Sequence, residues 1–257
     1  MKLAATCLSG QPLQGSLTER VPRTGRARIQ KEERMLTGTI DGVILDVDGT
    51  LWDSTQLVAR AWTQAVRDGG IAEYLVTGER LKQLFGKTME VIAQELLPGV
   101  SKEQRDRIME LCCDYEHRTL CEDECAICYP GVTDGIRRLS RMLPVFIVSN
   151  CQSGYIELFL EKTGLAPYVK DIECYGNTQR SKGENIRMVI DRNHLEHAVY
   201  VGDTQGDCEA SDEAGIPFIF ASYGFGNPDH MAGRIDCFSQ LVELIEKGRA
   251  AGREAER

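Results

Sequence analysis

Long apolar segments are absent from the 257-residue sequence. The longest runs, such as residues 145–148 and 216–220, are far shorter than the roughly 20 residues that a membrane-spanning helix requires. An apolar stretch near the start, Leu3 to Cys7, is likewise too short for the core of a signal peptide. We therefore expect a soluble, cytoplasmic protein that does not bind a membrane.

An excess of positive charge is also lacking, because 39 acidic residues outnumber 30 Lys and Arg residues and give a net charge of -9. Non-specific binding to nucleic acid requires a basic surface that displaces counterions. The sequence also contains no nucleic-acid-binding motif. These features exclude a nucleic-acid partner from our expectations. The hydrophobic content, 42%, is ample for a packed interior.

Cysteine is plentiful, with ten residues, but the regular spacing of a disulfide framework is missing. We expect reduced thiols. The spacing of Cys121, Cys125 and Cys128 matches the three thiolates that hold an iron-sulfur cluster in radical enzymes. Here they precede Tyr129-Pro130-Gly131, at the close of a helical region, which is the wrong context for such a cluster. On one helix face they would instead act as small hydrophobic side chains.

The first 38 residues lack apolar periodicity and are rich in Arg, Gly, Ser and Thr. We expect this segment to be a disordered, dispensable tail, because it offers nothing to bury. Two alternatives are a leader that weakly resembles a transit peptide, and a translation start at Met35.

The most informative stretch is an apolar run ending at Leu45, followed directly by Asp46-Val47-Asp48-Gly49-Thr50. The run predicts a buried strand, and Gly49 permits a sharp turn after it. Two carboxylates so close together repel each other unless a cation lies between them, so we expect a divalent metal there. The alternative is an ordinary Asp-Gly turn after a strand.

Residues 54–128 carry helical patterns that no strand pattern interrupts, and we predict that they form an all-helical cap domain inserted after the first strand. The predicted helices cover 55–67, 79–85, 89–97 and 102–120.

The rest of the chain, residues 39–53 and 129–250, alternates strands with helices, which predicts an α/β core domain with a doubly wound parallel sheet. Predicted strands cover 145–148, 171–175, 198–201 and 217–220, and predicted helices cover 132–142, 154–163, 183–192 and 238–247, with a further helix through Ala214.

In such sheets, ligands bind beyond the carboxyl ends of the strands. Polar residues follow three of the predicted strands directly, namely Asp46 with Asp48, Ser149 with Asn150, and Asp203 with Asp207. Lys182 begins the helix after another strand, near the same edge. Carboxylates with a divalent cation, an ammonium and a small hydroxyl suit a phosphoryl group, and one Asp can attack phosphorus.

These motifs, in this order, resemble the haloacid dehalogenase superfamily, specifically its phosphoglycolate-phosphatase-like branch with a helical cap. The resemblance spans about residues 40–245. It implies a Mg²⁺-dependent phosphatase that acts on a small phosphorylated metabolite through an aspartyl-phosphate. The implied catalytic residues are Asp46 as nucleophile and Asp48 as general acid/base, the implied metal ligands are Asp46, Asp48 and Asp203, the implied orienting residue is Asp207, and the implied phosphate-binding residues are Thr50, Ser149, Asn150 and Lys182.

The cap is expected to exclude water and to contact the leaving group. Its candidate specificity residues are Trp52, Gly86, Lys87 and Thr88, although Trp52 can instead pack the hinge and Lys87 can be solvated. Phosphoglycolate phosphatases commonly carry Val or Phe at the position of Trp52, which argues against phosphoglycolate itself. Two alternatives are phosphoryl transfer on a sugar phosphate, as in β-phosphoglucomutases, and a non-catalytic binding protein. We expect a monomer or homodimer.

Overall fold

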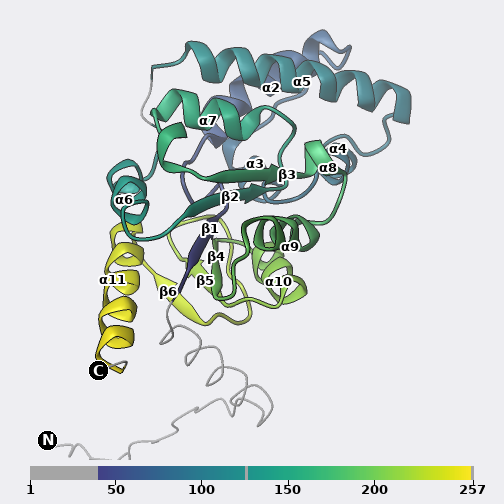
Figure 1. Ribbon diagram of the computed structural model, residues 1–257. Helices are drawn as coiled ribbons and strands as arrows, with labels where there is room; N and C mark the ends of the chain where they lie inside the picture. Colours follow the sequence, from purple (N-terminus) through teal and green to yellow (C-terminus); the bar gives the residue numbers. More distant parts are fainter. Residues whose placement is uncertain (1–39, 125–126, 256–257) are drawn as a thin grey trace, which may run out of the picture.

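The computed structural model describes residues 40–124 and 127–255 and contains a six-stranded parallel sheet (Figure 1). The strand order is β3-β2-β1-β4-β5-β6, so the first strand lies in the centre. The strands are β1 (Gly42–Leu45), β2 (Val145–Ser149), β3 (Asp171–Cys174), β4 (Ala198–Gly202), β5 (Phe218–Ala221) and β6 (Gly233–Ile235). Asp46 and Ser149 therefore lie at the carboxyl ends of adjacent strands, beside the end of β4.

Helices cover both faces of the sheet because side chains of a strand point alternately to opposite sides. Val43 and Leu45 belong to a core cluster shared with α6 (Val132–Leu139), α7 (Tyr155–Thr163) and α11 (Phe238–Ala255). Ile44 points to the other face, where it packs in a second cluster with α9 (Lys182–Asn193) and α10 (Gln205–Ala214). The predicted doubly wound α/β fold is thus confirmed.

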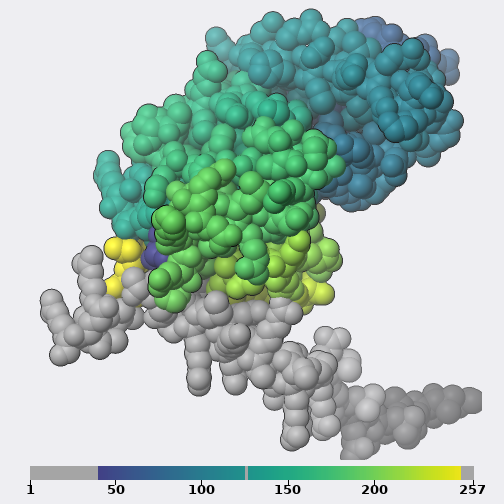
Figure 2. All heavy atoms as spheres, turned by 45° about the vertical axis from the view of Figure 1, so that its right-hand side comes forward, coloured from purple at the N-terminus to yellow at the C-terminus, as the bar shows by residue number. Residues whose placement is uncertain are grey.

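Four helices lie between β1 and α6, namely α2 (Thr55–Asp68), α3 (Gly78–Lys82), α4 (Met89–Leu96) and α5 (Lys102–Glu122). They form a lobe, blue to teal in Figure 2, beside the sheet-containing part of the molecule. Helices α2 and α5 pack against each other. Every fourth residue of α5, from Ile108 through Cys112 and Glu116 to Leu120, is buried, as expected for one face of a helix. The described residues of the insertion contain helices and turns, apart from the bridge at Cys128.

Some predicted boundaries were wrong. Strand β3 ends at Cys174, and Tyr175 starts the short helix α8 (Tyr175–Thr178) instead of continuing the strand. Strand β6 was not predicted, because three residues including Gly233 and Arg234 give no apolar pattern. Between α7 and β3 lies a single 3-10 turn, η1 (Ala166–Tyr168).

Helix α5 ends at Glu122, so Cys121 and Cys128 do not share a helix face. Cys128 lies in an extended bridge opposite Trp52, and Cys121 is an exposed thiol on the helix. Cys125 and the predicted tail, residues 1–38, lie outside the described residues. Among the helices of the described ranges, none combines the length and apolarity needed to cross a membrane.

Candidate active site

The turn after β1 packs against Asp203, which follows the end of β4. Gly49 adopts a left-handed backbone with φ 81°, a conformation that glycine adopts without strain. A Cβ atom at Gly49 would collide with the carboxylate of Asp203. A Cβ atom at Gly224 would likewise collide with the Asp203 side chain. Two glycines thus allow the Asp203 side chain to pack between backbone segments.

Lys182 connects two of these carboxylates. Its Nζ lies 3.0 Å from Oδ1 of Asp46 and 2.7 Å from Oδ1 of Asp207. The ammonium is placed by the first turn of α9, where Ser181 and Glu184 form a capping box. Burial disfavours the charged ammonium, but Asp207 and Asp46 outweigh this effect and raise the pKa of Lys182 above its ordinary value. Lys182 therefore stays charged in the interior.

Asp207 serves mainly to hold this arrangement. Its Oδ2 accepts hydrogen bonds from the backbone N–H groups of Asp203 and Thr204 and from the Thr204 hydroxyl. Burial alone would raise the pKa of Asp207, but Lys182 and the Thr204 donors lower it overall. Asp207 is thus an ionised residue whose two oxygens are both engaged.

Asp203 is almost completely buried, and burial together with Asp207 raises its pKa well above the ordinary value. One oxygen accepts the backbone N–H of Phe225 at 2.6 Å, and the other lies 3.4 Å from the Thr50 hydroxyl. These two donors orient the side chain and only partly compensate its burial.

Asp48 points away from Lys182 and into a hydrogen-bonded pocket. Its Oδ1 accepts from the Tyr155 hydroxyl at 2.8 Å, from Trp52 Nε1 at 3.1 Å and from Ser54 Oγ at 3.2 Å. Burial raises the pKa of Asp48 to about 7, and the Tyr155 hydrogen bond offsets part of this rise. A carboxyl group with a pKa near neutrality can both donate and accept a proton at neutral pH.

Ser149 and Asn150 extend from the end of β2 towards the helical insertion. A hydrogen bond from Ser149 helps to stabilise the ionised form of Asp46, whose pKa burial nevertheless raises to about 6. Asn150 Nδ2 donates to the backbone oxygen of Gly86 at 2.8 Å, which ties the two lobes together. Its Oδ1 is buried and has no hydrogen-bond partner among the described residues.

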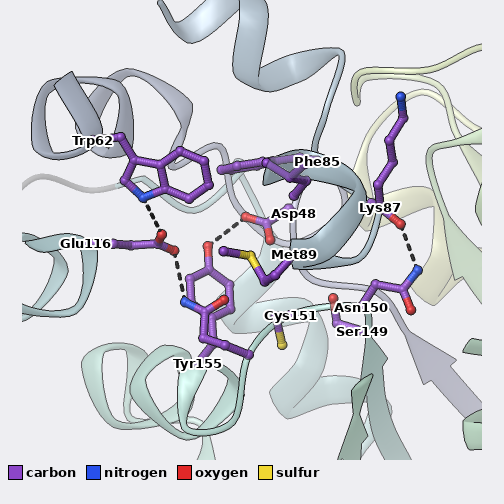
Figure 3. Close-up of a pocket in the computed structure, with 13 residues that line it drawn as sticks. Asp48, Trp62, Phe85, Lys87, Met89, Glu116, Ser149, Asn150, Cys151 and Tyr155 are labelled. Atoms are coloured by element: carbon purple, nitrogen blue, oxygen red, sulfur yellow. Dashed lines mark hydrogen bonds between the residues drawn. The ribbon is translucent and has the colours of Figure 1, made fainter. Parts of the chain in front are cut away.

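A small cavity of about 30 Å³ lies between the lobes, beside Asp48 (Figure 3). Ser149, Asn150 and Tyr155 line it from the core, and Phe85, Met89 and Glu116 are among the residues that line it from the insertion. Glu116 accepts hydrogen bonds from Trp62 Nε1 at 2.7 Å and from Gln152 Nε2 at 3.3 Å.

The described residues include a carboxylate cluster that fits a divalent cation. Ligand atoms of Asp46, Asp203 and Asp207 lie within 4.8 Å of one another. Oδ2 of Asp46 is buried and lacks a hydrogen-bond partner in the described part of the chain, as expected for an oxygen that binds a cation. Lys182 holds one oxygen of Asp207 and three donors hold the other, whereas Oδ1 of Asp203 has only a 3.4 Å contact with the Thr50 hydroxyl, so Asp46 and Asp203 are the better ligands.

The structure brings together Asp46, Lys182, Asp203 and Asp207, with Asp48, Thr50, Ser149 and Asn150 around them. Of the four candidate specificity residues, two line the cavity and two do not. Gly86 and Lys87 line the cavity, whereas its described wall includes neither Trp52 nor Thr88. Trp52 is fully buried and packs edge-on against Tyr155 and Phe159, as in the hinge-packing alternative.

The sequence interpretation missed Tyr155 and Glu116. Tyr155 carries no motif, and only the fold places it beside Asp48. Glu116 left a signal, because it is an acidic residue in the otherwise apolar row of α5 that includes Ile108, Cys112 and Leu120.

Similarity to known proteins agrees with this geometry. Residues 43–221 match the family described as haloacid dehalogenase-like hydrolase. The phosphoglycolate phosphatase of Rhodobacter capsulatus is 24% identical over 213 residues, covering 79% of this chain and 96% of that protein. Pyrophosphatase PpaX of Listeria innocua is 25% identical over 202 residues, covering 77% of this chain and 90% of that protein.

A crystal structure of a predicted phosphoglycolate phosphatase from Haemophilus somnus has the same fold, with a TM-score of 0.72 at 17% identity, covering 81% of this chain and 98% of that chain. The family match covers well over half of the chain and includes every strand-end motif from Asp46 to Asp207. The chain therefore belongs to the haloacid dehalogenase-like hydrolase family.

Proposed function

We propose that the protein is a Mg²⁺-dependent phosphatase that hydrolyses a small phosphomonoester through an aspartyl-phosphate on Asp46. The observation that carries this proposal is the buried contact of Lys182 with Asp46 and Asp207 at the carboxyl edge of the sheet. Family membership and the names of the phosphatase relatives support the same reaction class.

Asp46 and Asp203 would hold the Mg²⁺ ion, with the backbone carbonyl of Asp48 as a further ligand. When bound, the ion neutralises charge on the phosphoryl oxygens and orients the ester. Lys182 and Ser149 bind the remaining phosphoryl oxygens, and Thr50 and Asn150 complete the phosphate-binding set. Oxygen ligands in this number suit Mg²⁺.

In the first step, a carboxylate oxygen of Asp46 attacks phosphorus, and the bond between phosphorus and the leaving oxygen breaks. Asp48 transfers its proton to that leaving oxygen, so the product leaves as a neutral alcohol. The pKa of Asp48, raised to about 7 by burial, supports this role. Tyr155, Trp52 and Ser54 hold the carboxyl group in place.

In the second step, the ionised Asp48 removes a proton from water, and the resulting oxygen attacks phosphorus. The bond between phosphorus and Asp46 then breaks, which releases phosphate and restores the Asp46 carboxylate. Residues 54–128, as a cap over the core formed by 39–53 and 129–250, would exclude bulk water from these steps.

The test is phosphate release from a panel of phosphomonoesters, measured with Mg²⁺ and with EDTA. We expect turnover only with the metal, and a loss of about 10³-fold or more in Asp46→Asn, because the nucleophile is removed. Circular dichroism checks that the variant is folded. Full activity in EDTA would overturn the metal assignment, and activity retained in Asp46→Asn would overturn the nucleophile assignment.

A further inference from the structure

Glu116 stands out as a buried acid outside the phosphoryl site. Its side chain comes from α5, and the residue is only 3% exposed. Both side-chain oxygens accept N–H donors, one from Trp62 and the other from Gln152. Among the described residues, no Lys, Arg or His forms an ion pair with it. A buried charge normally has a partner of opposite sign. The described residues supply no such partner for an ionised Glu116.

The cavity that Glu116 lines is poor in cationic groups. Its side-chain nitrogen atoms belong mainly to neutral groups, which make hydrogen bonds from Trp62 and Gln152 to Glu116 and from Asn150 to Gly86. Lys87 lines the cavity, but its ammonium pairs with Glu95 at 2.7 Å and points away from Glu116 in Figure 3. A carboxylate on the leaving group would therefore find no uncommitted ammonium or guanidinium group in the described wall.

Acceptors and aromatic rings, by contrast, face this cavity. Oδ1 of Asn150 is buried without a donor, and the carboxyl group of Glu116 lies across the same cavity. Trp62 and Phe85, which also line it, stack edge to face with ring centroids 6.3 Å apart. Carboxylates and aromatic faces together are the groups that bind an organic cation.

We propose that Glu116 recognises an ammonium group on the leaving alcohol, so that the substrate is a short aminoalkyl phosphomonoester. This inference rests on the proposed phosphatase function, since Asp48, the proposed acid, lines the same cavity. A cavity of about 30 Å³ has room for about two or three water-sized groups. The leaving group is therefore short. Phosphoglycolate is disfavoured because its carboxylate would lie beside the acid Glu116 without a free cationic group in the described wall.

Three esters of equal chain length test the charge preference, namely 2-aminoethyl, 2-hydroxyethyl and carboxymethyl phosphate, with p-nitrophenyl phosphate as a general substrate. In the wild type we expect kcat/KM to be about tenfold or more higher for the aminoethyl ester than for the hydroxyethyl ester, and lowest for the carboxymethyl ester. In Glu116→Gln, which keeps the side-chain shape, the ratio of aminoethyl to hydroxyethyl turnover should fall close to one. Glu110→Gln removes a charge from an exposed position of the same helix and should retain the wild-type ratio.

A wild-type preference for the carboxymethyl or hydroxyethyl ester would overturn the assignment, as would an equal loss for all three esters in Glu116→Gln, which indicates a purely structural role. Hydrolysis of p-nitrophenyl phosphate without turnover of the three esters would overturn the substrate class and leave the phosphatase proposal standing. Absence of all turnover would overturn both. If Glu116→Gln does not fold, two measurements still test the proposal. They are the order of kcat/KM among the three esters in the wild type and the ratio of aminoethyl to hydroxyethyl turnover in Glu116→Asp, which keeps the carboxyl group.

Discussion

The phosphoryl site and the cavity beside Asp48 differ in whether their buried ionisable groups have partners of opposite charge. In the phosphoryl site, Lys182 lies within 3.0 Å of Asp46 and still closer to Asp207, so the chain supplies its own counter-charge. In the cavity, Glu116 has hydrogen bonds but no cation among the described residues. The core therefore carries a site whose charges are largely arranged before substrate arrives. The cap carries a buried acid that keeps its proton at neutral pH, because burial raises its pKa to about 8, and that a cationic group on a substrate would ionise.

The largest effect that would sharpen this comparison is expected at Asp48, which borders both regions. In Asp48→Asn, we expect kcat/KM for an alkyl phosphate to fall by about 10²- to 10⁴-fold, because the leaving alkoxide no longer receives a proton. The loss should be much smaller for p-nitrophenyl phosphate, whose leaving group is stable without a proton. Equal losses for the two esters, measured by phosphate release, would contradict the proton-donor role.

Removal of Lys182 should reveal the cost of leaving the core carboxylates without a partner. In Lys182→Met, we expect the free energy of unfolding to fall by about 3–5 kcal/mol, because Asp46 and Asp207 become buried and uncompensated. Urea denaturation in EDTA measures this change without a contribution from metal binding.

Lys102→Met is the matched control for this variant. Lys102 also forms an ion pair, with Asp106 at 2.6 Å, but both side chains are exposed, so we expect no measurable change in stability. Equal effects at Lys102 and Lys182 would show that the buried contacts do not stabilise the core.

The buried carboxyl group of Glu116 should make the free energy of unfolding depend on pH. Burial, helped by Asp48, raises its pKa from 4.5 to about 8, so the folded protein keeps a proton that the unfolded chain has lost. The contribution of Glu116 to stability is therefore fully present below pH 4.5 and is lost as pH rises towards 8.

The variant Glu116→Gln lacks this decline. As pH rises across that window, the free energy of unfolding of the variant minus that of the wild type should increase by up to about 1.4 kcal/mol per pH unit. Urea denaturation at several pH values measures the difference, with Glu110→Gln as the control that should follow the wild type. A difference that does not vary with pH would show that the Glu116 carboxyl group is not perturbed by its surroundings.

Features of the fold and the site that depend on local sequence could be predicted, whereas most contacts between residues distant in the sequence could not. The central strand and its Asp46-to-Thr50 turn were predictable, because apolar runs and glycine report local backbone structure directly. Convergence of Lys182 and Asp203 followed from the rule that parallel strands share a carboxyl edge. Tyr155 could not be predicted, because its contact with Asp48 joins residues 107 positions apart and has no local signature.

Glu116 shows what a closer use of periodicity could have found. An acidic side chain in the buried row of α5 conflicts with the pattern around it, and such conflicts between local pattern and fold tend to occur at functional sites. Strand β6 is the opposite case, since its three residues carry no pattern, and pairing with β5 alone makes them a strand.

The most direct test of the central claim is to identify the residue that becomes phosphorylated during turnover. The protein would be mixed with p-nitrophenyl phosphate and Mg²⁺, quenched in acid within milliseconds, digested and analysed by peptide mass spectrometry. We predict a phosphoryl group on Asp46 that is absent from Asp46→Asn. Phosphate release by the wild type with no phosphoryl group on Asp46, or with one on a different residue, would contradict the account.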